Sequence, residues 1–309
     1  MLLSICIPCC KRIEQLELTL TSIFQDNSDV PITDYEVILS DNDPLHEIEL
    51  LVNKFDFENL KYFHTDCEGF LNSYCVLTYA KGTFLKLHNS QAKFKKGSLT
   101  KIIDDIRGSQ DDKALLFYSN GMLNKNRVLA YDDFNSFMYN LSYWSSSSNG
   151  FCIWKDEFDK IGEIKLNPLF PHTSLFLTQH CLGKYIINDE YLFDVQRIPK
   201  RGGHNKFKAF TIEYPSLIDV YKSGYISMKC KKHILNDILF YFLPTLLFNK
   251  YVARIECFDI YGYKQNIKKY FPWFSYYLTY MLILIVPFNK LYNRIKKRLK
   301  KLSFLVYSG

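Results

Sequence analysis

The sequence predicts an α/β fold, with a mostly parallel sheet covered by helices on both faces and a helical, aromatic and basic extension behind it. Short apolar runs rich in β-branched residues alternate with segments whose apolar residues recur at helical spacing, which is typical of βαβ units. The charge then changes along the chain: residues 226–309 hold 15 Lys/Arg and 3 Asp/Glu, whereas residues 1–225 hold 24 and 29. We therefore expect a large domain over 1–215 and an extension over 216–309.

Composition excludes several classes of protein. Among 309 residues, 48% are hydrophobic and 23% are charged, so the chain can bury a core and is neither disordered nor a coiled coil. Nine scattered cysteines lack the paired spacing of a structural zinc site. Vicinal Cys9 and Cys10 are interpreted as turn residues rather than a redox pair. No signal peptide is recognised, and a reducing cytosol is the expected compartment.

The expected elements place polar residues at one edge of the sheet. Strands are predicted at 2–8, 35–39, 60–64, 83–87, 114–118 and 184–188, and helices at 14–24, 46–55, 71–80, 98–107 and 175–182. Ligands of parallel sheets bind beyond the carboxyl ends of the strands. Those ends carry the segments 8–12, 40–42 and 88–91.

The extension has the composition of a membrane-binding segment. Residues 270–288 carry no charge, are rich in aromatic residues and have a proline near each end, at Pro272 and Pro287. The next thirteen residues hold seven Lys/Arg and no acid around an apolar stripe. This pattern favours a helix lying on an anionic lipid surface. The expected contacts are Leu291, Ile295, Lys297, Arg298 and Leu299. A bilayer span and a packed core helix are the alternatives for 270–288, and no motif points to nucleic acid.

Four groups of residues carry a resemblance to a known family. They are Ser4-Ile5-Cys6-Ile7-Pro8 with Lys11-Arg12; Tyr35 to Asn42; Gly69, Asn72, Ala80, Gly82 and Phe84; and Gly97 with Leu99. In this order and spacing they resemble family 2 glycosyltransferases, over about residues 2–195. The resemblance implies a GT-A fold and transfer of a sugar from a nucleotide donor, of the type found in bacterial surface-polysaccharide (O-antigen or capsule) synthesis.

The same resemblance assigns candidate donor-binding residues. Asp41 would face the nucleotide base, Pro8 and Cys9 would contribute backbone, and Asn72 would orient the pocket. The full set of expected donor-site residues is Pro8, Cys9, Lys11, Arg12, Asp41, Asn72, His88, Asn89, Gln91, Arg197, Lys200 and Arg201. The cations among them would stabilise the leaving diphosphate, since Lys and Arg can bind phosphate directly. For residues 200–205 the alternative is a plain surface loop.

Two positions depart from the family pattern. The metal-binding Asp-x-Asp motif falls on Asn89-Ser90-Gln91, and neutral amides are poor ligands for Mg²⁺ or Mn²⁺. His88 adds either a nitrogen ligand or simply a hydrogen-bonding residue. Where the family has a catalytic Asp, this chain has His172, whose imidazole can take a hydroxyl proton.

Three hypotheses of function follow. The favoured one is an inverting glycosyltransferase, without a required metal, with His172 as base and a glycan acceptor. A polyprenyl-linked acceptor and a peripheral or monotopic place at the cytoplasmic face of the inner membrane fit the extension. The alternative is a catalytically inactive scaffold of a polysaccharide assembly complex. The third is a membrane or nucleic-acid-binding protein that merely shares the sheet, and it leaves the ordered motifs unexplained.

Overall fold

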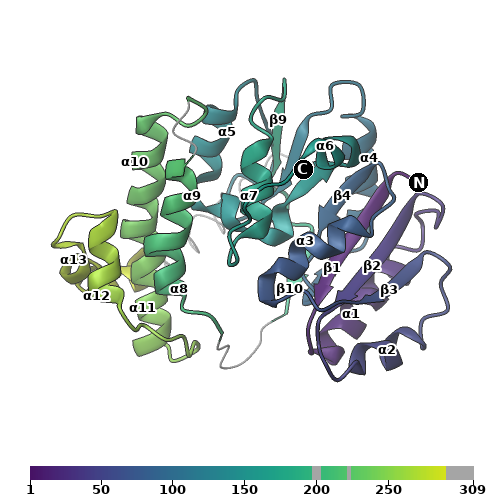
Figure 1. The fold of residues 1–309 in the computed structure, drawn as a ribbon, viewed down its shortest axis with the longest axis horizontal. Helices are drawn as coiled ribbons and strands as arrows, with labels where there is room; N and C mark the ends of the chain where they lie inside the picture. Colours follow the sequence, from purple (N-terminus) through teal and green to yellow (C-terminus); the bar gives the residue numbers. More distant parts are fainter. Residues whose placement is uncertain (197–202, 221–223, 290–309) are drawn as a thin grey trace, which may run out of the picture. The chain divides into compact units, whose positions relative to one another are not determined.

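The computed structural model describes residues 1–196, 203–220 and 224–289, and the chain divides into two compact units (Figure 1). Unit 1 comprises 1–197 and 217–231, and unit 2 comprises 198–216 and 232–309. The boundary at residue 215 stays a prediction. Leu291, Ile295, Lys297, Arg298 and Leu299, and likewise Arg197, Lys200 and Arg201, lie outside the described residues.

Unit 1 is built on a five-stranded sheet with the order β3-β2-β1-β4-β8. Its strands are β1 (Leu3–Cys9), β2 (Tyr35–Asp41), β3 (Leu60–His64), β4 (Phe84–Leu87) and β8 (Cys152–Trp154). The first four run parallel, and β8 pairs antiparallel with β4. The mostly parallel sheet predicted from the alternating pattern is thereby confirmed, and the carboxyl ends of β1, β2, β3 and β4 meet at one edge.

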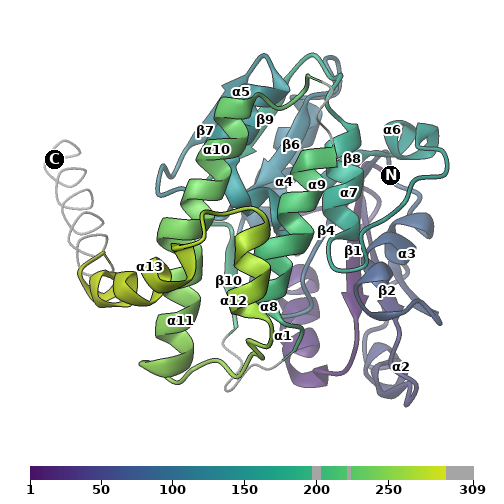
Figure 2. The same ribbon diagram turned by 60° about the vertical axis from the view of Figure 1, so that its left-hand side comes forward.

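Helices cover both faces of this sheet, as Figures 1 and 2 show. They are α1 (Ile13–Phe24), α2 (Glu47–Val52), α3 (Asn72–Thr78), α4 (Ser98–Arg107), α6 (Lys155–Lys160) and α7 (Pro171–Thr178), whereas α5 (Phe134–Leu141) packs on a smaller sheet of unit 1. One buried cluster joins alternate residues of β1 with the apolar faces of α1, α2 and α4. The opposite pleat of β1 and β2 receives α3, because successive strand side chains point to opposite faces.

Two smaller sheets complete unit 1. One has the order β6-β9-β7, from β6 (Leu115–Tyr118), β7 (Val128–Tyr131) and β9 (Tyr185–Asn188); the other pairs β5 (Ala92–Phe94) with β10 (Phe193–Val195). Strands β5, β7, β8 and β10 have three or four residues each, which is too short for a periodic sequence signal. The helix predicted at 175–182 instead begins at Pro171, a residue favoured in a first helical turn, and ends at Thr178.

Unit 2 is helical. It contains α8 (Lys206–Lys208), a π-helical turn (Ala209–Glu213), a second one (Ile238–Phe242), α11 (Leu243–Tyr251), α12 (Tyr263–Asn266), a 3₁₀ turn (Ile267–Lys269), α13 (Ser275–Leu282) and a final 3₁₀ turn (Ile283–Ile285). The helices α9 (Tyr214–Val220) and α10 (Met228–Asp237) have residues in both units. Within the described residues, no helix combines the length and apolar character needed to cross a bilayer.

Candidate functional site

One buried amide joins the carboxyl ends of β1 and β2. Asn72, the first residue of α3, donates from Nδ2 to the carbonyl of Ser40 at 2.7 Å and to that of Cys9 at 3.2 Å. Its Oδ1 accepts from Ser40 Oγ at 2.6 Å. Asn72 is 2% exposed, and its side-chain amide forms its hydrogen bonds with other groups of the protein. It holds the two strand ends in register and leaves recognition to their neighbours.

Asp41 lies fully buried at the end of β2. Its Oδ1 accepts from the backbone N–H of Asp43 at 3.0 Å, and its Oδ2 accepts from the Tyr62 hydroxyl at 3.1 Å. Burial, and then the Asp41 carboxylate, raise the pKa of Tyr62 above its usual range, which keeps that hydroxyl a donor. Asp41 thus shapes the turn that follows β2. Tyr62 was not predicted, because an alternating strand pattern does not say which tyrosine meets a neighbouring carboxylate.

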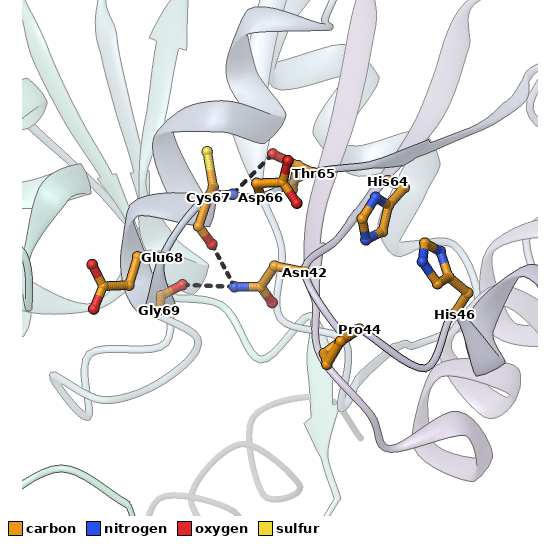
Figure 3. A pocket seen from close by; sticks show the side chains of 9 residues that line it. All are labelled: Asn42, Pro44, His46, His64, Thr65, Asp66, Cys67, Glu68 and Gly69. Atoms are coloured by element: carbon orange, nitrogen blue, oxygen red, sulfur yellow. Dashed lines mark hydrogen bonds between the residues drawn. The ribbon is translucent and has the colours of Figure 1, made fainter.

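A cavity of about 560 Å³ opens beyond β2 and β3 (Figure 3). Its lining comes from the loops after these two strands: Asn42, Pro44, His46, His64, Thr65, Asp66, Cys67, Glu68 and Gly69. Asn42 points across it and donates from Nδ2 to the carbonyls of Cys67 and Gly69, at 2.8 and 3.3 Å. The rings of His46 and His64 face each other with centroids 3.9 Å apart. The volume suits a small molecule, and the walls offer both flat rings and polar atoms.

A disulfide between Cys67 and Cys75 ties this cavity's loop to α3. This pair, whose cysteines are eight residues apart, was not predicted from the sequence, because nine cysteines allow many pairings. The bond restrains residues 67–75, which include both a wall of the cavity and Asn72. Cys9 and Cys10 are free thiols, and burial raises the pKa of both.

The end of β4 is built from neutral amides rather than carboxylates. The backbone N–H of Asn89 donates to Asn149 Oδ1 at 2.9 Å, and Asn89 Oδ1 accepts from Ser148 Oγ at 3.0 Å. The Asn149 carbonyl in turn accepts from Lys86 Nζ at 2.8 Å. Lys86 is fully buried, and burial lowers its pKa to about 8. This buried lysine holds the loop that contacts Asn89, a role that the apolar strand pattern around it concealed.

Arg12 reaches the same strand end. Its Nη1 donates to Gln91 Oε1 at 3.2 Å, which joins the turn after β1 to the turn after β4. Lys11 and Arg12 are both exposed and both have left-handed backbone conformations, with φ of 60° and 65°. Such conformations are uncommon for residues with side chains and cluster at functional sites. The backbone N–H of Gln196 donates to the Gln91 carbonyl at 2.9 Å, so the chain reaches residue 196 beside this cluster.

His88, which precedes Asn89-Ser90-Gln91, is buried in the core next to this segment. The side chain is fully buried against the rings of Phe94 and Phe193, and its Nε2 lies within hydrogen-bond distance of the Ala92 carbonyl. Burial, and then the charge of Lys86, hold the pKa of His88 well below its usual range. This neutral ring supports the turn after β4 through Nε2, and its Nδ1 is buried without a hydrogen-bond partner among the described residues.

His172 is the second residue of α7 and is 5% exposed. Its Nε2 lies 2.8 Å from the Ser146 carbonyl, so Nε2 carries the proton and donates it. Nδ1 is then an acceptor, and it has no hydrogen-bond partner in the part of the chain that the structure describes. Burial lowers the pKa of His172 to about 4, close to that of an ordinary aspartate. The segment 146–149 therefore bonds to both His172 and Asn89.

These donor atoms do not fit a divalent cation. Mg²⁺ and Mn²⁺ need several anionic or carbonyl oxygens, whereas Gln91 Oε1 already accepts from a guanidinium and Asn89 Oδ1 from a hydroxyl. Among the described residues, no group of three or more His, Cys, Asp or Glu is placed to hold a metal ion. The positive charge at this strand end comes from Lys11 and Arg12.

Comparison with family models gives no match, and comparison with curated proteins gives none either. Solved structures do match. S. aureus TarS 1–349 gives a TM-score of 0.56 at 14% identity, over 88% of this chain and 81% of that one. The same TarS segment in complex with UDP-GlcNAc gives 0.56 at 15% identity, over 87% and 80%. The mannosyltransferase PcManGT from Pyrobaculum calidifontis, in complex with GDP-Man and Mn²⁺, gives 0.50 at 14% identity, over 79% and 71%.

The fold is that of GT-A-like glycosyltransferases. At these identities the likeness concerns the fold, and it confirms the GT-A-like architecture expected from the sequence. The residues of the site are this chain's own, and their roles stay predictions. What the geometry does place together is Asp41 with Asn72 at one corner, Arg12 with Gln91 and Asn89 at the next, and His172 across the segment 146–149.

Proposed function

We propose that this protein transfers a sugar from a nucleotide-sugar donor to a hydroxyl group of a glycan acceptor. The observation that carries the proposal is the edge of the sheet in a GT-A-like fold, where a cavity of about 560 Å³ is lined by Asn42, whose backbone N–H donates to the Cys9 carbonyl just before the cationic turn of Lys11 and Arg12. The cavity between the β2 and β3 loops would take the nucleoside. Lys11 and Arg12 would face the diphosphate, because a guanidinium binds phosphate oxygens in a bidentate manner.

The chemistry proposed is a single displacement with inversion. An acceptor hydroxyl oxygen bonds to the anomeric carbon, and the bond from that carbon to the diphosphate oxygen breaks with its electron pair. His172 Nδ1 takes the hydroxyl proton, while Nε2–H stays on the Ser146 carbonyl and fixes the tautomer. A pKa of about 4 keeps the ring neutral at pH 7 and gives it the basicity of a carboxylate.

The departing diphosphate gains negative charge, and fixed cations stabilise that charge without a metal. The Arg12 side chain donates to the Gln91 side chain, and the backbone N–H of Gln196 donates to the Gln91 carbonyl. Gln196 immediately precedes Arg197 in the sequence. Arg197, Lys200 and Arg201 would add charge from the segment that follows. A lipid-linked acceptor, a role in O-antigen or capsule synthesis and a place at the cytoplasmic face of the inner membrane belong to the same proposal.

The test is a thermal-shift and calorimetry panel of UDP, GDP, UDP-GlcNAc and GDP-mannose, each with EDTA or with Mn²⁺. A ligand present at about 100 times its Kd stabilises the native state by about 2.7 kcal/mol. We expect one nucleotide family to stabilise the protein equally with and without metal. Stabilisation that requires Mn²⁺ would contradict the metal-free mechanism.

The absence of carboxylates from Asn89, Ser90 and Gln91 favours one other function, that of a catalytically inactive scaffold. A scaffold predicts no stabilisation by any nucleotide of the panel, or binding without turnover. Binding together with a loss of transfer activity in His172→Ala would instead support the enzyme.

A further inference from the structure

The helix α13 buries small polar side chains and exposes some of its large apolar and aromatic ones. Ser275 and Thr279 are 0% exposed, and the Thr279 hydroxyl lies 2.8 Å from the Tyr263 hydroxyl inside unit 2. Tyr277 and Met281 are exposed on this helix, and its other large side chains are half-buried: Tyr276, Leu278, Tyr280 and Leu282. A surface helix of a water-soluble protein shows the opposite arrangement, with an apolar stripe turned to the core.

Five of the exposed residues recur at intervals of three or four, and Phe274 and Ile285 beside them are exposed too. Of the five, Trp273 is 73% exposed, and the others are Tyr277 at 53%, Met281 at 69%, Leu284 at 75% and Phe288 at 71%. Their spacing is four, four, three and four residues; Tyr277 and Met281 share one face of α13, whereas Trp273 lies in the turn before it and Leu284 in the 3₁₀ turn after it. We call these five residues the α13 stripe. Isolated exposed apolar residues are ordinary, but a continuous run of this kind marks an interaction surface.

The sequence from α12 onward carries only positive charge, and the acids Glu256 and Asp259 lie shortly before it. From Ile260 to Gly309 the sequence contains ten Lys/Arg and no Asp or Glu. Three of these, Lys264, Lys268 and Lys269, are exposed on α12 and the 3₁₀ turn that contacts α13. Lys264 Nζ lies 5.4 Å from the ring centre of Tyr277, within the stripe itself. A protein partner would need a strongly acidic face to match, whereas an anionic lipid surface offers that charge everywhere.

We infer that the α13 stripe is a docking surface for an anionic lipid bilayer, into which unit 2 inserts apolar side chains without crossing it. Trp273 and Tyr277 would occupy the interfacial layer that Trp and Tyr prefer, and Met281, Leu284 and Phe288 would reach the acyl chains. The lysines would meet the lipid phosphates. Figure 2 shows α13 as a short segment beside α11, and no described helix is suited to span a membrane.

The test uses the full chain and vesicles of phosphatidylcholine with or without phosphatidylglycerol, separated by sedimentation. We expect binding to the anionic vesicles that weakens with salt. Leu284→Asp should lower the partition coefficient by about tenfold or more, because one well-buried leucine side chain is lost from the bilayer. The matched control is Leu50→Asp, at a residue that is 71% exposed on α2 in unit 1. This control should bind as the wild type does.

Tryptophan fluorescence gives a second readout. Vesicles with brominated acyl chains should quench the wild-type protein, and Trp273→Phe should lose most of that quenching while it still sediments, since the other two tryptophans belong to unit 1, where Trp154 is 3% exposed and Trp144 is half-buried. Equal partition of Leu284→Asp and the wild type would overturn the inference. So would a dimer in light scattering that Leu284→Asp dissociates, because the stripe would then be a subunit interface. Nucleotide calorimetry without vesicles separates this result from the proposed sugar transfer.

Discussion

Two regions of the site differ in how their buried polar side chains are hydrogen-bonded: the ends of β1 and β2, and the end of β4 with the start of α7. At the β1–β2 corner every polar group of Asn72 has a partner inside the protein, at 2.6 to 3.2 Å. Around the end of β4 and the start of α7, His88 and His172 each give one ring nitrogen to a backbone carbonyl and keep a buried Nδ1 without a partner among the described residues. Asn72 is thus a fully satisfied support, although Asp43 Oδ2 near the same corner also lacks a partner among the described residues, and the second region keeps two unpartnered ring nitrogens.

This difference separates positioning from chemistry. A fully satisfied buried amide stabilises a fold and offers nothing to a ligand. An unpartnered buried acceptor costs stability, and it is kept where some function uses it. For His172 that function is acceptance of a proton, whereas the aromatic walls of His88 leave it a supporting role. Four predictions test this division.

The largest effect is expected for His172→Ala. Removal of a general base lowers turnover by about 10²- to 10⁴-fold, and nucleotide affinity should stay the same because His172 is outside the cavity. The measurement is kcat with the donor that the binding panel identifies. His180→Ala is the matched control, at a half-buried histidine just past the end of α7. Turnover of His172→Ala close to the wild-type value would remove His172 from the mechanism.

Acid should destabilise the protein through both buried histidines. The unfolded chain binds a proton at His172 as the pH falls through about 6.5, whereas the folded state binds it only near the lowered pKa of about 4. Between these values the unfolded state holds more protons. The free energy of unfolding therefore decreases by about 1.4 kcal/mol for each unit by which the pH is lowered, for each such histidine. Burial lowers the pKa of His88 in the same direction.

Urea unfolding from neutral pH down to about pH 5 measures this slope. His172→Gln should remove one histidine's share of it and leave the remainder. A flat profile for the wild type, or an unchanged slope in the variant, would show that these rings are protonated in the folded state.

The sheet was predictable and much of the site was not, for a physical reason. A short apolar run with β-branched residues predicts a buried strand such as Tyr35–Asp41, and the loops after parallel strands lie at one edge of the sheet. Contacts between distant loops follow from tertiary packing. The bond from Lys86 to the Asn149 carbonyl joins residues 63 positions apart, and no local pattern encodes it. The Tyr62–Asp41 pair was not predicted for the same reason, whereas the Cys67–Cys75 disulfide was not predicted because nine cysteines allow many pairings.

Asn72→Ala should destabilise the β1–β2 corner. The variant leaves the Cys9 and Ser40 carbonyls without their side-chain donor in a buried place, and we expect a loss of about 2–3 kcal/mol in the free energy of unfolding. The control is Asn140→Ala, since among the described residues that exposed amide donates only to the Ser136 carbonyl of its own helix. The control should change stability by less than about 0.5 kcal/mol. Equal effects in the two variants would show that the corner is not held by Asn72.

The smallest effect, and the one that best separates phosphate from base recognition, is expected for Arg12→Ala. Arg12 is exposed and bonds only to Gln91 among the described residues, so its removal should barely change stability. Affinity for the nucleoside diphosphate should fall about tenfold, or about 1.4 kcal/mol, and should depend less on salt. Affinity for the nucleoside alone should not change, because the cavity lies at the β2 and β3 loops. Arg107→Ala, on the surface of α4, is the charge-matched control. An equal loss for nucleoside and diphosphate would place Arg12 at the base and reverse the proposed orientation of the donor.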